Sequence, residues 1–475
     1  MKLIIAQTEL DKLLEIVSHA VPKRPAHPIL SNLLLVCNTV AQQLTITAFD
    51  HRLGIRATCA CDVQQDGQIA LPAKLLSDVV SQLPKNSMTL ELRNNAVVLT
   101  HATGKCQIQA VSAEEFPALP EINNTITALP THKLLQLLKA TLFAASRDES
   151  KQVINGVHFK FFQSNCEAAA TDGHRLAVAA VAVETDLGST STTQEPIEAT
   201  IPCQSLVELK RLLVKVPNNC NCTIGINEAI AVFDLPNLRV TSRLLEGQYP
   251  PYHSLIPQQF QYHLKIDKQT LEAALKRLAI VAENKNNTAK ATFDLKQQLA
   301  TLQARSPSLG SAVESVALGS QSDSQEQLDI GFNLKYLIDG LEHISTSEVT
   351  IKANQPNTPV ILNPVNDSLA HLVLVMPLEI TGAWEEVENL QKESPAQPEE
   401  VAAAQTEVKA ELEAQSDDAA LDESIPPQAV AGTTEAPHDE SEDEVNQEIA
   451  EIAEKKRTKA KNPKKKSQPA AANAS

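Results

Sequence analysis

The sequence predicts an α+β protein made of three similar domains, each with two helices packed on antiparallel sheets, followed by a disordered C-terminal tail. Three observations predict this: a strand–helix unit that recurs along the chain, alternating apolar and polar residues between the helices, and a change of composition after about residue 380. The length of 475 residues also suits several domains of roughly 100–200 residues each.

One strand–helix unit opens each predicted domain. The three copies are LIIAQTELDKLLEIVSHAV from Leu3, ITALPTHKLLQLLKATLFAAS from Ile126 and YHLKIDKQTLEAALKRLAIVAE from Tyr262. Leucines and alanines recur at helical spacing in each copy, after an expected N-cap at Thr8, Thr131 or Asp267.

A second strand–helix unit follows in each domain. Its helices are expected to start near Pro72, Pro202 and Asn333. Intervening runs such as QLTITAF and NLRVTSRLL alternate with period two, which indicates half-buried antiparallel strands. We therefore place the domains at residues 1–125, 126–257 and 258–380.

Residues 381–475 differ from the rest of the chain. They are rich in Glu, Ala, Gln, Pro and Ser, so they cannot bury enough apolar surface to offset the entropy of ordering. We expect a disordered acidic tail that ends in the basic block KKRTKAKNPKKK, from Lys455. That block could either solvate the tail or contact nucleic acid.

Positive charge is concentrated in the helical segments, although the formal net charge of the chain is −17. The bases of the second domain's helices are Lys133, Lys139, Arg147, Lys210, Arg211 and Lys215, against the single acid Glu208. These could be ordinary solvated helix faces. Alternatively, equivalent helices share one surface that faces a polyanion and contacts phosphates without reading sequence.

No segment of the sequence predicts a membrane span or a cofactor site. The apolar run of the N-terminus, MKLIIA, is too short for a signal peptide, and no run approaches the length of a transmembrane helix, so we expect a cytoplasmic protein. Eight cysteines include the pairs Cys59/Cys61 and Cys220/Cys222, whose spacing does not suit zinc. We expect reduced thiols, no metal and no cofactor.

The stretch ATDGHRLAV raises the question of catalysis. Asp172 and His174 could form a reaction centre, but Asp172-Gly173 between alternating apolar runs also indicates a hairpin turn. The first domain carries a related Asp50-His51-Arg52. The chain contains no GxxxxGK[ST], HExxH or GxSxG motif, so we expect no catalytic residues and a turn that lines a binding site.

The chain resembles the bacterial sliding clamp, the beta subunit of DNA polymerase III. The resemblance covers residues 1 to about 380 and lies in ATDGHRLAV, RPAHPILSNLLL, LVMPLEI and the threefold repeat. It implies DNA-clamp domains arranged as half of a closed ring, and a homodimer that encircles double-stranded DNA without sequence specificity. The implied role is a non-catalytic processivity factor that tethers the replicative polymerase alpha subunit, the clamp loader and other clamp-binding-motif proteins. The alternative is a monomeric peptide-binding scaffold that encircles no DNA.

The resemblance also implies three sets of site residues. The partner-peptide pocket would comprise Ile154, Thr171, Gly173, His174, Arg175, Leu176, Pro250, Leu255, Val360, Leu374, Val375, Met376, Pro377 and Leu378. The DNA-facing set would be Arg24, Lys139, Arg147, Lys151, Lys210, Arg211 and Lys215. The dimer interface would be Cys106 and Ile108 against Ile280 and Val281. Ser254 and Glu379 depart from the basic residues that many relatives carry, and the tail has no counterpart in the family pattern.

Overall fold

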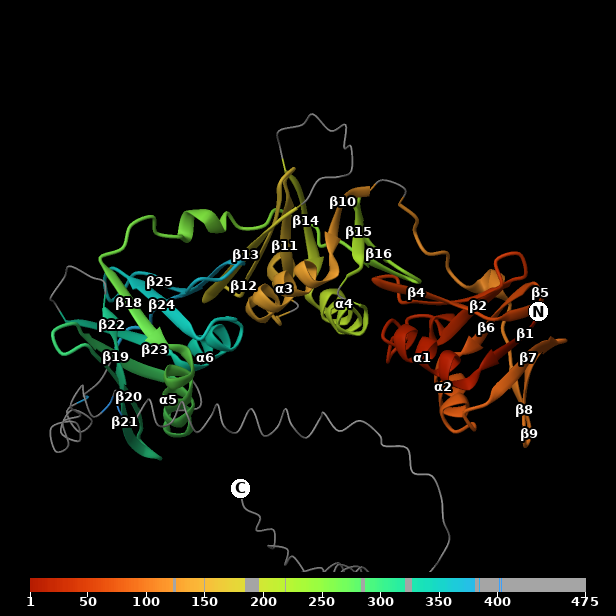
Figure 1. The fold of residues 1–475 in the computed structure, drawn as a ribbon, viewed down its shortest axis with the longest axis horizontal. Helices are drawn as coiled ribbons and strands as arrows, with labels where there is room; N and C mark the ends of the chain where they lie inside the picture. Colours follow the sequence, from red (N-terminus) through yellow and green to blue (C-terminus); the bar gives the residue numbers. More distant parts are fainter. Residues whose placement is uncertain are drawn as a thin grey trace, which may run out of the picture. The chain divides into compact units, whose positions relative to one another are not determined.

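The computed structural model describes residues 1–122, 125–148, 150–183, 196–217, 219–282, 287–320 and 327–380, with single positions at 384, 401 and 403. The side chains of residues 152 and 320 are not described. Within these ranges the chain forms six α-helices and four antiparallel sheets (Figure 1). Apart from the three single positions, the predicted tail at 381–475 lies outside the described residues.

The first domain contains helices α1 (Gln7–Ser18) and α2 (Ala73–Ser81). Its strands are β1 (Lys2–Ala6), β2 (Asn32–Asn38), β3 (Gln43–Phe49), β4 (Leu53–Ala60), β5 (Asp62–Gln65), β6 (Gly67–Pro72), β7 (Ser87–Arg93), β8 (Ala96–His101) and β9 (Gly104–Gln109). Five of them form a sheet in the order β5-β1-β7-β8-β9, so β9 lies at its edge.

The second domain contains helices α3 (Thr131–Thr141) and α4 (Cys203–Lys215). Its strands are β10 (Thr125–Pro130), β11 (Gly156–Phe161), β12 (Asn165–Thr171), β13 (Arg175–Ala182), β14 (Ile197–Pro202), β15 (Asn221–Ile226), β16 (Ile230–Leu235) and β17 (Leu238–Arg243). All of them belong to sheets that this domain shares with a neighbour.

The third domain contains helices α5 (Lys268–Val281) and α6 (Leu334–Glu342). Its strands are β18 (Tyr262–Asp267), β19 (Thr288–Asp294), β20 (Leu299–Ser306), β21 (Gly310–Ala317), β22 (Gly319–Ser320), β23 (Leu328–Asn333), β24 (Glu348–Ala353), β25 (Val360–Pro364) and β26 (Ala370–Val375). Four of them form a separate sheet in the order β21-β20-β19-β23.

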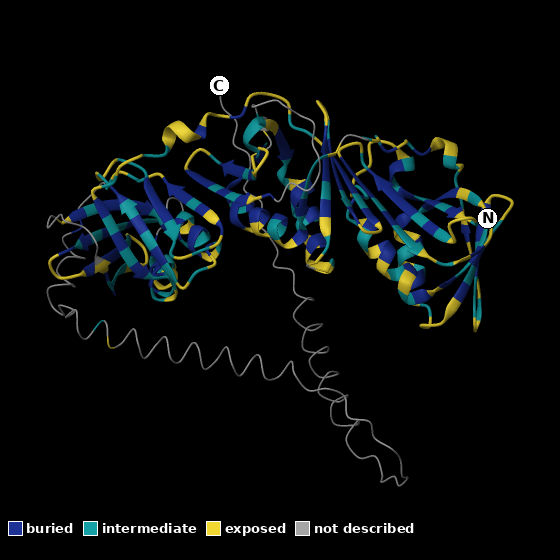
Figure 2. Ribbon diagram, turned by 45° about the horizontal axis from the view of Figure 1, so that its top comes forward, coloured by how far each residue is buried: buried dark blue, intermediate teal, exposed yellow. Residues whose placement is uncertain are grey.

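Two sheets run across the domain boundaries. An eight-stranded sheet, β10-β15-β16-β17-β4-β3-β2-β6, joins the second domain to the first through β17 and β4. A nine-stranded sheet, β14-β11-β12-β13-β26-β25-β24-β18-β22, joins the second domain to the third through β13 and β26. Buried residues line the helix-facing side of these sheets (Figure 2). Val240 opposite Ile55 is one such apolar pair in the core. Neighbouring domains are therefore joined by main-chain hydrogen bonds as well as by linkers.

The six helices form a continuous row. The two helices of each domain pack side by side against its sheets (Figure 1). Between domains, Lys215 on α4 contacts Glu15 on α1 with Nζ and Oε1 2.6 Å apart. Phe143, just after α3, stacks on His343 at the end of α6 with ring centroids 4.3 Å apart. The order is therefore α2-α1-α4-α3-α6-α5, which we call the helix row.

Helix starts agree with the sequence analysis in four of the six cases. Pro72, Pro202, Asp267 and Asn333 are N-caps, and Asp267 accepts a hydrogen bond from the backbone N–H of Thr270. The expected caps Thr8 and Thr131 are wrong, because both lie inside their helices and the N-caps are Ala6 and Pro130. A strand that runs directly into a helix leaves the capping position to its own last residue.

Candidate functional site

The stretch ATDGHRL forms a tight turn between β12 and β13. Gly173 has φ +95°, a conformation that a side chain disfavours. One Asp172 oxygen accepts hydrogen bonds from the backbone N–H groups of His174 (2.9 Å) and Arg175 (3.1 Å). The related turn of the first domain uses Asp50 in the same way, with His51 at φ +69°. The Asp172 carboxylate therefore serves the turn, as the repeat predicts.

Arg175 connects this turn to the third domain. Its side chain is 9% exposed, and Nε donates to Asp172 Oδ2 at 3.0 Å. Nη1 donates to Asp339 Oδ2 on α6 at 2.6 Å, and Nη2 donates to the Phe143 carbonyl at 2.8 Å. The guanidinium also lies over the Tyr336 ring, 4.9 Å from its centroid. This arginine holds the second and third domains together beneath the turn.

An apolar cluster lies on the face of the nine-stranded sheet that points away from the helices. Leu176 of β13 is opposite Leu374 of β26, and both are 1% exposed. They pack with Tyr249 and Tyr252, and with Ile361 of β25. The next residues along both strands, Ala177 and Val373, point toward the helices. The nine-stranded sheet thus has a helix-covered inner face and an outer face that carries an apolar cluster around β13, β26 and β25.

Some predicted pocket residues lie at the surface beside this cluster. Met376 is 37% exposed and its backbone N–H donates to the His174 carbonyl at 2.9 Å, while Leu255 is 50% exposed. Gly173 and Pro250 are also exposed, whereas Ile154, Pro377 and Leu378 are partly buried. Together we call Met376, Leu255, His174 and Pro250 the outer basin.

The remaining predicted pocket residues are buried. Thr171 is 8% exposed, and its Oγ1 donates to the Arg175 carbonyl at 2.6 Å. Val360 and Val375 are opposite each other in β25 and β26 with no exposed surface, and they belong to the third domain's core. These residues support the strands that carry the outer basin.

Sequence reasoning missed the aromatic residues beneath this surface. The Tyr252 hydroxyl donates to Glu167 Oε1 at 2.5 Å, and burial raises the pKa of Tyr252. Next to them lies a hollow of about 550 Å³ lined by Glu167, His253, Ile256 and Leu372, among others. The repeated aromatics of GQYPPYHSL were the available sequence signal, because buried Tyr hydroxyls need partners.

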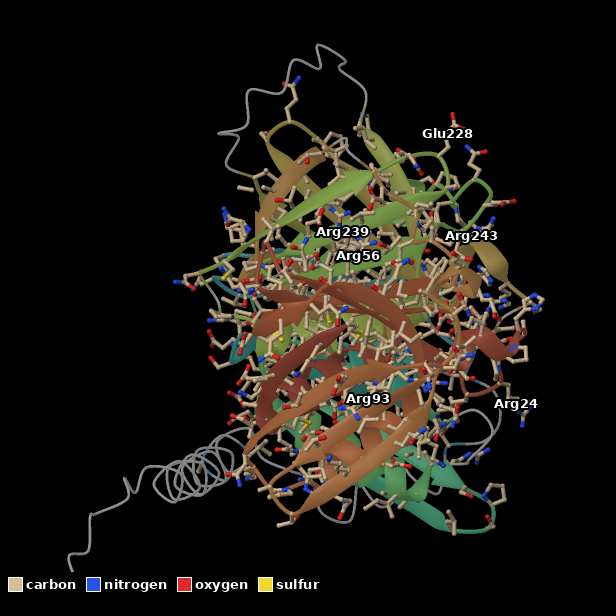
Figure 3. All side chains as sticks on the ribbon, turned by 90° about the vertical axis from the view of Figure 1, so that its right-hand side faces the viewer. Arg24, Arg56, Arg93, Glu228, Arg239 and Arg243 are labelled. Carbon is tan, nitrogen blue, oxygen red and sulfur yellow. The ribbon has the colours of Figure 1, made fainter. Side chains whose placement is uncertain are left out.

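The predicted DNA-facing cations differ in their partners. Arg24, Lys139, Arg147 and Lys151 are exposed, and Arg24 projects outward in Figure 3. Burial and the nearby Lys139 both lower the pKa of Lys210, so these two bases of α3 and α4 lie close together. None of these five bases forms an ion pair with another described residue. Two others are paired: Arg211 with Glu208 at 2.9 Å, and Lys215 with Glu15 at 2.6 Å.

The predicted interface residues lie on an edge strand of the first domain and at the end of a helix of the third. Cys106 is half-buried on the edge strand β9, whereas Ile108 of the same strand is only 1% exposed and packs in the first domain's core. Ile280 near the end of α5 is 76% exposed, and Val281 is partly buried. Helix α5 packs beside β21, which is the edge strand of the four-stranded sheet.

The described ranges hold neither a metal site nor a membrane span. No group of three or more His, Cys, Asp or Glu side chains there is placed to hold a metal ion. None of the helices in those ranges is long and apolar enough to cross a bilayer. All eight cysteines are free, and burial raises the pKa of Cys37 to about 12.

Three family models match the chain in succession. They are the N-terminal domain of the DNA polymerase III beta subunit at residues 1–120, its central domain at 128–251 and its C-terminal domain at 253–379. The beta sliding clamp of Synechococcus elongatus is 38% identical over 382 residues, which span 80% of this chain and 100% of that relative. The beta sliding clamp of Synechocystis is 39% identical over 399 residues, with the same shares covered.

A solved structure has the same fold. The crystal structure of the DNA polymerase III subunit beta from Pseudomonas aeruginosa superimposes with a TM-score of 0.74 at 25% identity, over 80% of this chain and 100% of that one. The repeated domains, the two shared sheets and these matches lead to one conclusion. The chain belongs to the DNA polymerase III beta subunit family, the bacterial sliding clamps of DNA replication.

Proposed function

We propose that two copies of this chain close into a ring around duplex DNA and tether replication and repair proteins to it. One observation carries the proposal: helices α3 to α6 of the helix row and the apolar cluster beside the outer basin lie on opposite faces of the same nine-stranded sheet. One face can therefore meet DNA while the other meets proteins. The ring is a non-catalytic cytoplasmic processivity factor, and the chemistry belongs to the proteins that it holds.

The cations of the helix row suit weak, mobile contact with DNA. Lys139, Arg147 and Lys210 are not engaged in ion pairs with other described residues, so they can approach phosphates without first breaking one. Such contacts read no sequence, because phosphates are the same along every duplex. Neutralisation of Arg211 and Lys215 by acids keeps the total attraction modest, which favours sliding.

Ring closure is supported by two edge strands. β9 ends one sheet in the first domain, and β21 ends another in the third. Unpaired strand edges favour pairing with a second chain. The exposed Ile280 on α5 adds an apolar anchor, and the half-buried Cys106 of β9 offers it an apolar contact. Ile108 then supports the interface from the domain core.

The outer basin suits a short extended peptide with apolar anchors. Met376 has a flexible side chain that adapts to different apolar groups, and Leu255 is exposed next to Ile256, which packs against the apolar cluster. The turn at Gly173 and His174 fixes one wall. A few such anchors give exchangeable binding that the polymerase alpha subunit, the clamp loader and other partners can share.

Assembly is tested by the variant Ile280→Asp. A charge at an exposed apolar anchor should split the dimer without disturbing the fold, and light scattering measures the mass. Lys296→Ala, at an exposed position of the same domain, is the matched control. A wild-type chain that is monomeric at micromolar concentration would support the alternative, a peptide-binding scaffold that encircles no DNA.

The outer basin is tested by Met376→Ala combined with Leu255→Ala. Both side chains are exposed, so their removal should weaken binding of a Leu-Phe peptide in calorimetry and leave the melting temperature unchanged. Leu176 is unsuitable for this test because it is 1% exposed and its truncation would open a cavity. Unchanged peptide affinity in the double variant would refute the pocket.

A further inference from the structure

The chain continues past the family match, which ends at residue 379, and its next described residue after Ile380 is buried. Trp384 is 8% exposed, and the Arg305 guanidinium lies over its ring, 5.3 Å from the centroid. The indole N–H has no acceptor among the described residues. Trp384 is therefore shielded from solvent and makes a cation–π contact with Arg305.

Arg305 lies on the outer face of the four-stranded sheet. On β20, Ala300, Leu302 and Ala304 point into the third domain's core, so the alternate residues point outward. Those outward residues are polar but covered: Thr301 is 4% exposed and Gln303 is 2% exposed. A solvated sheet face would leave such side chains open to water. This outer face is thus a covered surface, with Trp384 packed on the arginine at one end.

The segment that leads away from the outer basin meets the edge of the same sheet, where Leu378 forms an antiparallel bridge with Gly331 of the edge strand β23. The backbone N–H of Leu378 donates to the Gly331 carbonyl of β23 at 2.8 Å. Gly331, Lys290 and Gln303 are opposite one another across β23, β19 and β20. A Cβ on Gly331 would lie 2.4 Å from the Leu378 carbonyl oxygen, so only glycine admits this close approach.

We propose that the outer face of the four-stranded sheet is a docking site for Trp384, and that docking holds Met376–Ile380 in place as one wall of the outer basin. The positioning of Met376–Ile380 as a wall of the outer basin rests on the proposed function of that basin. Contacts on both sides of Leu378 fix the segment: Met376 is bonded to His174, and Trp384 is packed on Arg305.

Docking can be measured by tryptophan fluorescence, because Trp384 is the only tryptophan of the chain. In the full-length protein we expect a blue-shifted emission and protection from acrylamide quenching. Arg305→Ala should shift the emission toward that of hydrated tryptophan and increase quenching, whereas Lys296→Ala, which removes a charge from the β19–β20 turn at the other end of β20, should change neither. An emission typical of a hydrated indole in the wild type would overturn the docking site.

The effect on the outer basin is measured by calorimetry with a Leu-Phe peptide. Trp384→Ala should weaken binding about 3- to 10-fold, because the loosened wall must be ordered again on binding. Trp384→Phe keeps an aromatic face and should bind as the wild type does. Unchanged affinity in Trp384→Ala would overturn the positioning role. A wild type that protects Trp384 yet binds no peptide would refute the proposed function and support the docking site.

Discussion

At the scale of single residues, Arg175 has the densest set of partners at the site. Its neighbours in sequence predicted a turn, since Asp172 and Gly173 act locally. The sequence could not indicate that the guanidinium reaches Asp339 on α6, because that hydrogen bond spans 164 positions and depends on strand pairing between domains. Hydrogen bonds within a turn can be predicted from a short stretch of sequence, whereas partners that are distant in sequence are determined by the fold.

Replacing Arg175 with Ala should destabilise the chain by about 2–4 kcal/mol, because Asp172 and Asp339 would then be left without charge-assisted partners in a mostly buried place. Urea unfolding of the full chain measures this. Arg93→Ala, which breaks only an exposed pair with Glu91, is the control and should cost far less. Equal destabilisation in the two variants would contradict the role given to Arg175.

His371 makes the junction of the second and third domains sensitive to acid. It is 4% exposed, Nε2 donates to the Ala140 carbonyl at 3.1 Å, and burial lowers its pKa to about 4. Since the unfolded chain takes up the proton first, stability should fall as pH drops from about 6.5 toward about 4. The expected decrease between about pH 7 and about pH 5 is roughly 2 kcal/mol.

This decrease can be measured by thermal unfolding at the two pH values. His371→Gln keeps a donor for the Ala140 carbonyl but does not titrate, so its stability should depend less on pH over the same range. An identical acid dependence in the two proteins would show that His371 remains free to take up a proton in the folded state.

At the scale of elements, the sequence predicted helices and strands well, because hydrophobic periodicity is local and repeats three times. Four helix starts were right, and two failed because the predicted caps Thr8 and Thr131 lie inside helices whose N-caps are Ala6 and Pro130, which have no side-chain hydrogen-bond acceptor to mark them in the sequence. Charge was predicted less completely. The basic character of α4 was evident, but its ion pair between Lys215 and Glu15 on α1 needs the fold.

The bases of the helix row that are free of ion pairs with described residues should contribute most to DNA binding. The double variant Lys139→Ala and Lys210→Ala should reduce the salt dependence of duplex DNA binding, by about 0.9 in the log–log slope for each phosphate that is no longer neutralised. The matched control removes an ion pair with no change in net charge, Lys215→Ala with Glu15→Ala. Equal slopes for the wild type and the lysine variant would place these bases away from DNA.

At the scale of the whole molecule, topology should matter more than affinity. If two chains close around DNA as proposed, the ring loaded on nicked circular DNA should stay bound through a rise in salt that releases proteins held by phosphate contacts alone. Linearising the DNA should then release it. Gel filtration of labelled protein with plasmid measures retention, and Ile280→Asp serves as the form that cannot close. Salt-dependent dissociation from intact circles would contradict encirclement.

The two sheets that cross domain boundaries also determine where such an assembly can be opened. Separating neighbouring domains would break a row of main-chain hydrogen bonds at β17–β4 or β13–β26. It would also expose the apolar cores that these strands cover. Parting two chains at their strand edges would leave every one of those cores intact. The interface between subunits should therefore be easier to open than the boundaries between domains, and each subunit should move as a rigid body.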